Sequence, residues 1–472
     1  MSANVKLGNN TLTGFDTIRL ENADAAGEYV PFSLGMSGAY KVTFNVDGSA
    51  YTVVSVVAGE SVQKPTAPNK TGYTFNGWWT AQTGGTQVTF PYTPVADTTF
   101  HAQFTAGATI GFTGLTNSSG NLTWTGAIAG AASWQKTTVG NNVTITSPLD
   151  NVFPFNRIEE FTDSSGNVFV KFPKCYIKFI YSGTAIDGFN VSSSNDGGDM
   201  FIPDCFLDPH DTTCSTYLDY FALGKYEASG SSSKIYSKTG QTCLVNITRA
   251  QGRTAARAYG TSSNYYNGYQ MIDFSMLTLF NFLAMLYYKT GNIQTVMPGR
   301  TSDTSAGGQS WTSAASTGTT DGISALNGYN TAGDCVKILG VENPFGNVFK
   351  WIDGAYFSTG TIYAHRLPQY FADSTTNAVN LGFSRPTASG YISALRAGNA
   401  GGTISYVYCS VASGSAATYV GDYCSYASTG GVLCSGGSWY NTANAGLWYL
   451  RGSYTASSAS TNVGARLAYR PL

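Results

Sequence analysis

Charged residues and histidine are scarce in this chain. Charged side chains make up 11% of the 472 residues, and histidine occurs only 3 times. Soluble domains average nearer ~25% charged residues. The net charge is −1. Without a run or face of Lys and Arg there is no electrostatic footprint for nucleic acid, so we expect no nucleic-acid partner.

The chain also lacks the spacings that hold metals. None of its 8 cysteines forms a Cys-x-x-Cys pair, and histidine is too rare to complete a zinc site. An acidic stretch over 196–211 has no EF-hand pattern and is interpreted as a solvated loop. We predict no metal and no cofactor. Spacing leaves disulfides and free thiols both open, and assembly in a reducing cytoplasm would favour thiols.

Segments for export or membrane insertion are not evident. The opening residues MSANVKLGNN have neither a charged region nor an apolar core, so we expect no signal peptide. The most apolar stretch, MIDFSMLTLFNFLAMLYY, is interrupted by Asp273 and Asn281. It predicts a buried amphipathic helix over 271–289, with Gly291 at its C-terminal end, and no membrane insertion.

Glycine and aromatic residues are abundant instead. The chain holds 55 Gly, 31 Tyr and 26 Phe, which is typical of short strands joined by long ordered loops. TRAQGRTAARAYG predicts a helix beginning near Thr248, which is a cap-like residue. We therefore expect a multidomain chain with β-rich N-terminal modules, followed by an α+β domain over 151–472.

The N-terminal third divides into unequal pieces. Residues 1–38 contain NVKLGNNTLTGFDTIRLENA, which predicts a small hairpin around an Asn-Asn turn. Such a hairpin buries little alone, so it is expected to attach or oligomerise the chain; a floppy terminus is the alternative. Residues 107–150 alternate apolar and polar positions and are predicted to be a β linker or a small β domain.

Residues 39–106 carry the clearest local pattern. YKVTFNVDG is a strand entering an Asp-Gly turn, and the chain continues through two prolines, GYTFNGWW and the closing strand TTFHAQFTA. This pattern resembles the Listeria–Bacteroides (internalin B-type) repeat. The matching residues are Val42, Thr43, Phe44, Pro65, Pro68, Gly72, Tyr73, Phe75, Gly77, Trp78 and Phe104. The resemblance implies a β-grasp-like module that serves surface proteins as a spacer or interaction unit.

Three motifs occur in order near the C-terminus. They are NPFGNVFKW over 343–351, GGSW over 436–439 and GAR over 464–466. Together they resemble formylglycine-generating-enzyme-like domains and the variable proteins of diversity-generating retroelements, which include the phage major tropism determinant. The resemblance implies a C-type-lectin-like fold over 151–472. The expected scaffold residues are Trp351, Gly436, Gly437, Trp439 and Arg466, with Arg466 satisfying buried carbonyls or a carboxylate.

The catalytic features of the resembled enzymes are missing. Those enzymes use cysteines that follow the GGSW motif, whereas no cysteine follows Cys434 here, and His101, His210 and His365 lie elsewhere. Glu342-Asn343-Pro344 only partly resembles the calcium motif of sugar-binding lectins, and no Trp-Asn-Asp follows it. We predict a binding domain without enzymatic activity.

The segment 404–460 has the composition of an adaptable binding surface. Tyr and Trp supply contact area at low entropic cost, and Ser, Gly and Asn supply adaptable hydrogen bonds. The resemblance places ligand contacts here, and Trp448 and Tyr449 are adjacent, so either can instead belong to the core. The candidates are Tyr408, Tyr419, Tyr423, Tyr426, Tyr440, Asn441, Asn444, Trp448, Tyr449, Arg451 and Tyr454.

The sequence thus predicts a phage virion protein of the tail-fibre or head-fibre type, assembled in the host cytoplasm. Its N-terminal segment would contact other virion proteins, and its C-terminal domain would bind a host surface protein or glycan. A homo-oligomer is expected for avidity, with a trimer as the guess. The alternatives are a bacterial surface adhesin, a virion decoration protein without a receptor and a degenerate enzyme. Ligand, host and head or tail location stay open.

Overall fold

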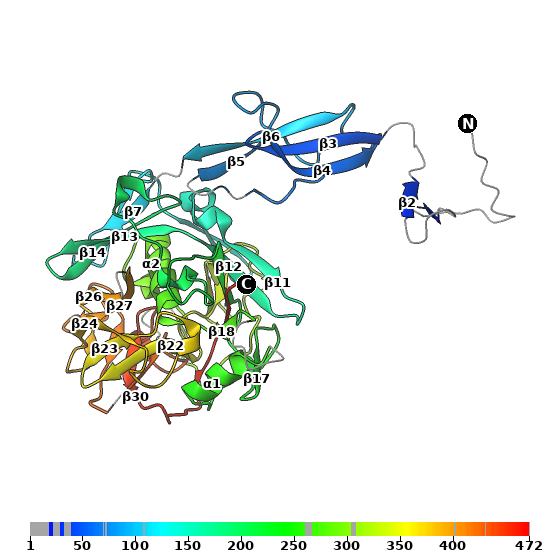
Figure 1. Ribbon diagram of the computed structural model, residues 1–472. Coiled ribbons are helices and arrows are strands. Elements are labelled where there is room, and N and C mark those ends of the chain that lie inside the picture. The colour runs from blue at the N-terminus through cyan, green and yellow to red at the C-terminus, as the bar shows by residue number, and fades with distance from the viewer. Residues whose placement is uncertain are drawn as a thin grey trace, which may run out of the picture. The chain divides into compact units, whose positions relative to one another are not determined.

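The computed structural model divides the chain into two compact units, Met1–Ala106 and Gly107–Leu472 (Figure 1). Each unit is described by itself. The structure describes residues 18–21, 29–32, 39–68, 70, 73–106, 109–259, 267–303, 308–400, 403–429 and 431–471.

The described part of the N-terminal segment contains one strand pair. β1 (Ile18–Glu21) pairs antiparallel with β2 (Tyr29–Phe32). The Asn-Asn turn on which the sequence prediction rested, at residues 9 and 10, lies outside the described residues.

The rest of the smaller unit is a four-stranded sheet in the order β4-β3-β6-β5. Its strands are β3 (Ala39–Val46), β4 (Ser49–Val57), β5 (Tyr73–Trp79) and β6 (Thr98–Ala106). The two central strands, β3 and β6, run parallel, and the outer two are antiparallel to them. Phe44, Trp78 and Phe100 are almost fully buried, and the rings of Phe44 and Trp78 meet edge-on at 4.8 Å. This unit therefore has a hydrophobic core of its own.

Two α-helices lie among the described residues of the larger unit. α1 (Arg249–Ala256) begins after a capping box in which Thr248 and Gln251 satisfy each other's backbone amides. α2 (Phe274–Tyr288) begins after Asp273, whose side chain accepts from the Met276 amide. Gly291 is not its cap, because Lys289 adopts the left-handed conformation at the C-terminal end.

Helix α2 is buried on every side rather than amphipathic. All 15 of its residues are buried, and the helix runs through the middle of the larger unit (Figure 1). A helix that is apolar all round needs protein on all faces, and several sheets supply it. Among the described residues, neither helix combines the length and hydropathy needed to cross a membrane.

Six sheets lie among the described residues of the larger unit. A sheet in the order β24-β23-β22-β29-β30-β28-β25, with β31 beside β22, is the largest. Its strands are β22 (Phe349–Ser358), β23 (Thr361–Ala364), β24 (Val379–Ser384), β25 (Gly390–Tyr391), β28 (Tyr423–Ser425), β29 (Val432–Ser435), β30 (Leu450–Tyr454) and β31 (Val463–Gly464). The hairpin of β26 (Ala394–Ala400) and β27 (Thr403–Val411) packs nearby, with β27 against α2.

The remaining sheets join distant parts of the sequence. One follows the order β11-β12-β15-β32-β18, from β11 (Glu159–Thr162), β12 (Val168–Pro173), β15 (Tyr220–Gly224), β18 (Tyr269–Met271) and β32 (Leu467–Tyr469). Another follows β13-β14-β7-β8, from β7 (Ile110–Thr113), β8 (Thr123–Gly126), β13 (Tyr176–Ser182) and β14 (Ala185–Ser192). A third follows β21-β20-β19-β10-β9, from β9 (Gln135–Val139), β10 (Asn142–Thr146), β19 (Gly328–Asn330), β20 (Cys335–Ile338) and β21 (Val341–Glu342). β16 (Ser229–Ser231) pairs with β17 (Lys234–Tyr236).

Residues 107–150 do not form the separate linker or small domain that the sequence predicted. β7 pairs with β14, and β10 pairs with β19, so this segment completes two sheets of the larger unit. Trp124 donates its indole N–H to the Leu286 carbonyl of α2 at 2.7 Å. The segment is therefore part of the same core as residues 151–472.

Candidate functional site

One side of the largest sheet carries three tyrosines and one arginine, and the turn after β29 adds a fourth tyrosine, Tyr440. We name Tyr391, Tyr423, Tyr440, Arg451 and Tyr454 the Tyr–Arg face. Strands β25, β28, β30, β29 and β22 are consecutive neighbours in this sheet. Residues directly opposite each other share a face of the sheet. Across the strands, Tyr391 pairs with Tyr423, and Arg451 pairs with Cys434, which pairs with Trp351.

Aromatic contacts join Tyr391 to Tyr423 and link Tyr423 to the rings beneath the face. Tyr391 and Tyr423 meet edge-on with centroids 5.2 Å apart, and Tyr423 meets Tyr449 at 5.9 Å. Tyr449 is only 5% exposed and packs on the buried Phe349 at 5.0 Å. Tyr449 therefore belongs to the floor beneath the face rather than to the surface. Edge-to-face aromatic contacts of this kind hold rings in fixed orientations.

The guanidinium of Arg451 lies over two aromatic rings. Its guanidinium carbon is 4.0 Å from the centroid of Tyr454 and 5.5 Å from that of Phe349. Its Nε donates to the Ser453 hydroxyl at 3.1 Å. The rings and this hydrogen bond orient the charge, and within the described residues no carboxylate forms a salt bridge with it. A half-buried, pre-oriented cation beside tyrosines is a typical anchor for binding a partner.

The loop of the GGSW motif positions Tyr440. Gly436 and Gly437 have φ of +96° and +75°, and a side chain at Gly437 would collide with Ala445. The Asn441 side chain accepts from the Ser438 amide at 2.8 Å, which closes the turn. Tyr440 is 45% exposed, and its hydroxyl accepts from Asn462 at 2.8 Å. The loop thus fixes an exposed ring.

The predicted residues Asn441 and Asn444 belong to this turn. Both are half-buried, and the Asn444 amide donates to the Asn441 carbonyl at 3.1 Å. Trp439 is half-buried beneath Tyr440, with ring centroids 4.9 Å apart, and its amide donates to the Asn347 carbonyl at 2.9 Å. These residues hold the loop next to the Tyr–Arg face.

The hydroxyls of Tyr391 and Tyr454 stay protonated near neutral pH. Burial raises the pKa of Tyr391, and the neighbouring Tyr423 and Asp303 raise it further. Burial also raises the pKa of Tyr454, which the Arg451 charge partly opposes. These phenols can therefore donate as well as accept hydrogen bonds at pH 7.

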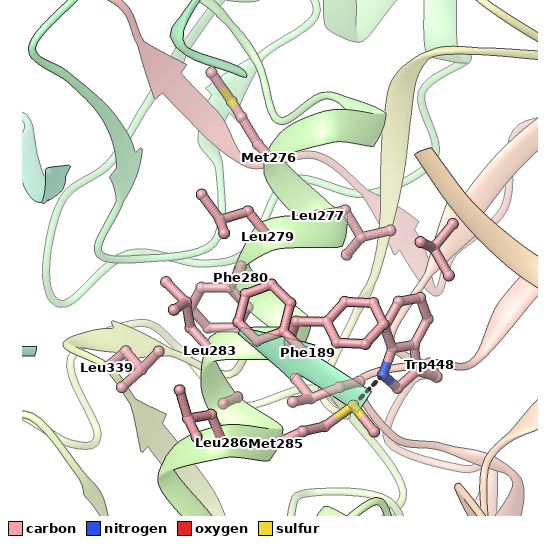
Figure 2. Packing of buried hydrophobic residues seen from close by; sticks show 14 of the residues in the cluster. Phe189, Met276, Leu277, Leu279, Phe280, Leu283, Met285, Leu286, Leu339 and Trp448 are labelled. Atoms are coloured by element: carbon pink, nitrogen blue, oxygen red, sulfur yellow. Dashed lines mark hydrogen bonds between the residues drawn. The ribbon is translucent and has the colours of Figure 1, made fainter. Parts of the chain in front are cut away.

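Two predicted contact residues lie in the core instead. Trp448 and Tyr408 are both 0% exposed. The Trp448 indole N–H points at Met285 of α2, with nitrogen and sulfur 3.0 Å apart (Figure 2). The Trp448 ring also meets that of Phe282. Tyr408 packs on Phe357 at 5.2 Å. Because both side chains are fully enclosed, Trp448 and Tyr408 cannot touch a surface ligand.

Two other predicted residues make contacts outside the ring group. Tyr419 has φ of +55°, and its backbone amide donates to the Ser118 carbonyl at 3.0 Å. Tyr426 lies under the guanidinium of Arg385 at 4.8 Å. Both are half-buried, and the ring contacts that join the Tyr–Arg face do not include them.

Sequence reasoning missed Tyr391. It lies outside the 404–460 segment, in a two-residue strand, and joins the face only because β25 pairs with β28. No local pattern marks it. Among the predicted scaffold residues, Trp351 is a buried support whose indole donates to the Ile247 carbonyl at 2.9 Å, whereas Trp439 is half-buried. Arg466, 1% exposed, donates to the carbonyls of Gly224, Lys225, Glu342 and Asn343.

Metal-binding groups are not assembled among the described residues, where no cluster of three or more His, Cys, Asp or Glu side chains forms. The acidic stretch over 196–211 is divided among separate partners. Asp204 pairs with Arg366 at 2.8 Å, Asp199 pairs with Lys178, and Asp211 accepts from the hydroxyl and amide groups of the turn that follows it. These carboxylates do not converge on one point.

A buried carboxyl group supports the loop that carries Tyr440 and Tyr449. Asp422 is 1% exposed, and its Oδ2 accepts from the Trp448 amide at 2.7 Å, while Oδ1 has no partner among the described residues. Gly446 is required beside it, because any side chain there would overlap the carboxyl. Burial raises the pKa of Asp422 well above its ordinary value.

This shift gives a pH-dependent prediction. Because the pKa of Asp422 is higher in the folded than in the unfolded state, its contribution to stability is complete below about pH 4 and declines as pH rises. Asp422→Asn removes that decline. Relative to the wild type, we expect the free energy of unfolding of the variant to rise by about 1.4 kcal/mol for each pH unit above 4, until the folded carboxyl ionises.

Urea unfolding between pH 4 and pH 9 measures this difference. Asp199→Asn is the matched control, since Asp199 is an exposed partner of Lys178 and should follow the wild-type curve. A constant difference between Asp422→Asn and the wild type at every pH would contradict the prediction.

Comparison with known proteins identifies part of the smaller unit. Residues 40–103 match the family described as the Listeria-Bacteroides repeat domain. An 82-residue stretch is 48% identical to internalin H of Listeria monocytogenes serovar 1/2a, covering 16% of this chain. The chain spans only 15% of the length of that relative. One repeat of this kind is therefore present.

Proposed function

We propose that this chain is an adhesin-like attachment protein that binds its partner through the Tyr–Arg face, without catalysis. The observation that carries the proposal is the series of contacts that runs from Tyr391 through Tyr423, Tyr449 and the buried Phe349 to the Arg451–Tyr454 pair. Tyr and Arg residues dominate the energetics of protein interfaces. The partner we propose is a cell-surface protein or glycan.

The side chains of the face suit binding better than chemistry. Nucleophilic catalysis by cysteine needs an accessible thiolate. All 8 cysteines are free, but every one except Cys214 is buried. Burial raises the pKa of Cys335 and of Cys434 to about 12, so these thiols stay protonated near neutral pH. The proposal therefore assigns no enzymatic role.

The smaller unit fits the same function as a spacer or interaction module. The Listeria-Bacteroides repeat and the internalin H match support a bacterial surface protein, which the sequence analysis held as its first alternative. We therefore place the adhesin-like role ahead of the phage role. The C-type-lectin-like fold implied by the three C-terminal motifs stays part of this proposal.

A virion attachment protein is the second candidate. The free thiols favour it, because 8 unpaired cysteines suit a chain that folds in a reducing cytoplasm and is released inside a particle. The resemblance of the C-terminal motifs to phage variable proteins also supports it. Both candidates use the same face and differ in the surface that it meets.

The test is binding of fluorescently labelled full chain to cells, with animal cells and bacterial cells as separate arms. The variant carries Tyr440→Ser and Arg451→Gln, which remove an exposed ring and the oriented charge. We expect saturable wild-type binding that weakens at least about tenfold in the variant, the effect of about 1.4 kcal/mol at an interface anchor.

The matched control is Tyr181→Ser, because Tyr181 is 43% exposed on another sheet while Tyr440 is 45% exposed. Binding to animal cells supports the adhesin, and binding to bacterial cells supports the virion protein. Equal binding by the wild type and the double variant, with both folded by circular dichroism, would refute the Tyr–Arg face as the site.

A further inference from the structure

The smaller unit has one covered and one uncovered sheet edge. At the β5 edge, residues 86–88 fold back: the Val88 amide donates to the Trp78 carbonyl at 2.8 Å, and Gln87 bridges to Trp79. At the other edge, β4 pairs only with β3 among the described strands. The outward N–H and C=O groups of β4 therefore have no strand beside them in that part of the chain.

Strand β4 also lacks the features that prevent an edge strand from pairing with a strand of another chain. Its sequence, SAYTVVSVV, contains no charge and no proline. Tyr51, Val53 and Val57 are 46%, 44% and 42% exposed. Edge strands elsewhere in the chain carry charge, such as Glu159 and Glu160 in β11. A bulge at Tyr51 leaves a regular run from Thr52 to Val57. An exposed, apolar, uncharged edge is a pairing site for another strand.

We propose that β4 pairs antiparallel with β4 of a second copy of this chain, joining two sheets into one across a two-fold axis. The absence of charge selects this occupant. In such a pair the strand faces an identical strand. A charged residue near the two-fold axis would therefore lie opposite or diagonal to the same charge in the other copy and be repelled by it. Because β4 carries no charge, two β4 strands can pair without repulsion, with their β-branched residues packed against each other.

Val53 lies near the middle of the new seam. On the outward side of the sheet, Ser55 and Val57 follow Val53 along β4, and Thr43 of β3 lies opposite Val53. The two Val53 side chains therefore lie opposite or diagonal to each other, within reach of long side chains. The pairing goes beyond the proposed attachment function, because it makes the chain bivalent and so able to bind by avidity.

The test is the mass of the full chain, measured by sedimentation equilibrium, with Val53→Lys, Val53→Glu and an equimolar mixture of the two. We expect a wild-type dimer at about 100 μM, monomers for each variant alone, and a dimer again in the mixture, where Lys meets Glu. Val95→Lys, at a 79% exposed position outside β4, is the control and should remain dimeric.

Three results would overturn the pairing. The wild type could be monomeric at this concentration, the single variants could remain dimeric, or the mixture could stay monomeric while the wild type dimerises. Each variant is checked for folding by circular dichroism of the full chain. Because mass alone is measured, the outcome is independent of whether the Tyr–Arg face binds cells.

Discussion

Replacing Glu227 by alanine is expected to lower the free energy of unfolding of the larger unit by about 3–5 kcal/mol, because it leaves a buried lysine without its counter-ion. Glu227 Oε1 lies 3.0 Å from Lys350 Nζ, and both side chains are almost fully buried, at 2% and 4% exposure. Such an effect would exceed the effects of most single substitutions.

The carboxylate holds more than the lysine. Its Oε1 also accepts from the Val348 amide at 3.2 Å, and its Oε2 accepts from the side chains of Asn347 and Asn343. Burial lowers the pKa of Lys350 to about 8, and Glu227 opposes that shift. Removing the carboxylate therefore leaves these donors and an ammonium group in a dry environment.

Urea unfolding followed by circular dichroism measures the loss, and the transition of the smaller unit should not move. The double variant Glu227→Gln with Lys350→Met is the control, because a buried ion pair replaced by groups of similar size costs little. A Glu227→Ala variant within about 1 kcal/mol of the wild type would contradict the prediction, since a buried, unpaired charge costs more than that.

Trp448→Ala is expected to cost about 3–5 kcal/mol, the range for removing a large buried aromatic side chain. The indole fills space between α2 and the sheet, meets Phe282 at 5.3 Å and donates to Met285 (Figure 2). Because Trp448 is 0% exposed, its loss creates a cavity rather than removing a surface contact.

The same urea experiment distinguishes the buried residues of segment 404–460 from its exposed residues. Tyr440→Ala, four residues after Gly436 and 45% exposed, should stay within about 0.5 kcal/mol of the wild type, as surface substitutions do. If Trp448→Ala were as stable as Tyr440→Ala, the burial of Trp448 would be refuted, and the residue would return to the set of candidate ligand contacts.

Local signals predicted the helices well. Thr248 caps α1 through a capping box, and the apolar run over 271–289 forms α2. The amphipathic character was not correct, because the sheets that cover the second side of α2 come from segments far away in the sequence. Residues 107–150 were misassigned for the same reason, since their strands pair with β14 and β19.

The candidate site was predicted in part. Composition identified the segment that carries Tyr423, Tyr440 and Arg451, but not which residues face outward. Trp448 and Tyr449 are adjacent in the turn before β30, and adjacency alone does not say that Trp448 packs on Phe282 of α2 while Tyr449 packs on Phe349. Tyr391 depends on the β25–β28 pairing, and Tyr408 is buried because β27 packs on α2.

The position of β32 has a consequence for synthesis. This strand lies between β15 and β18, and Arg466 just before it reaches the Gly224 carbonyl, 242 positions earlier. At about 5–20 residues per second, roughly 10–50 seconds of translation separate the two partners. During that time β15 and β18 have no strand between them, and their edges are open to wrong pairings. A lower growth temperature and additional chaperone should therefore raise the yield of folded chain. Neither should change its free energy of unfolding.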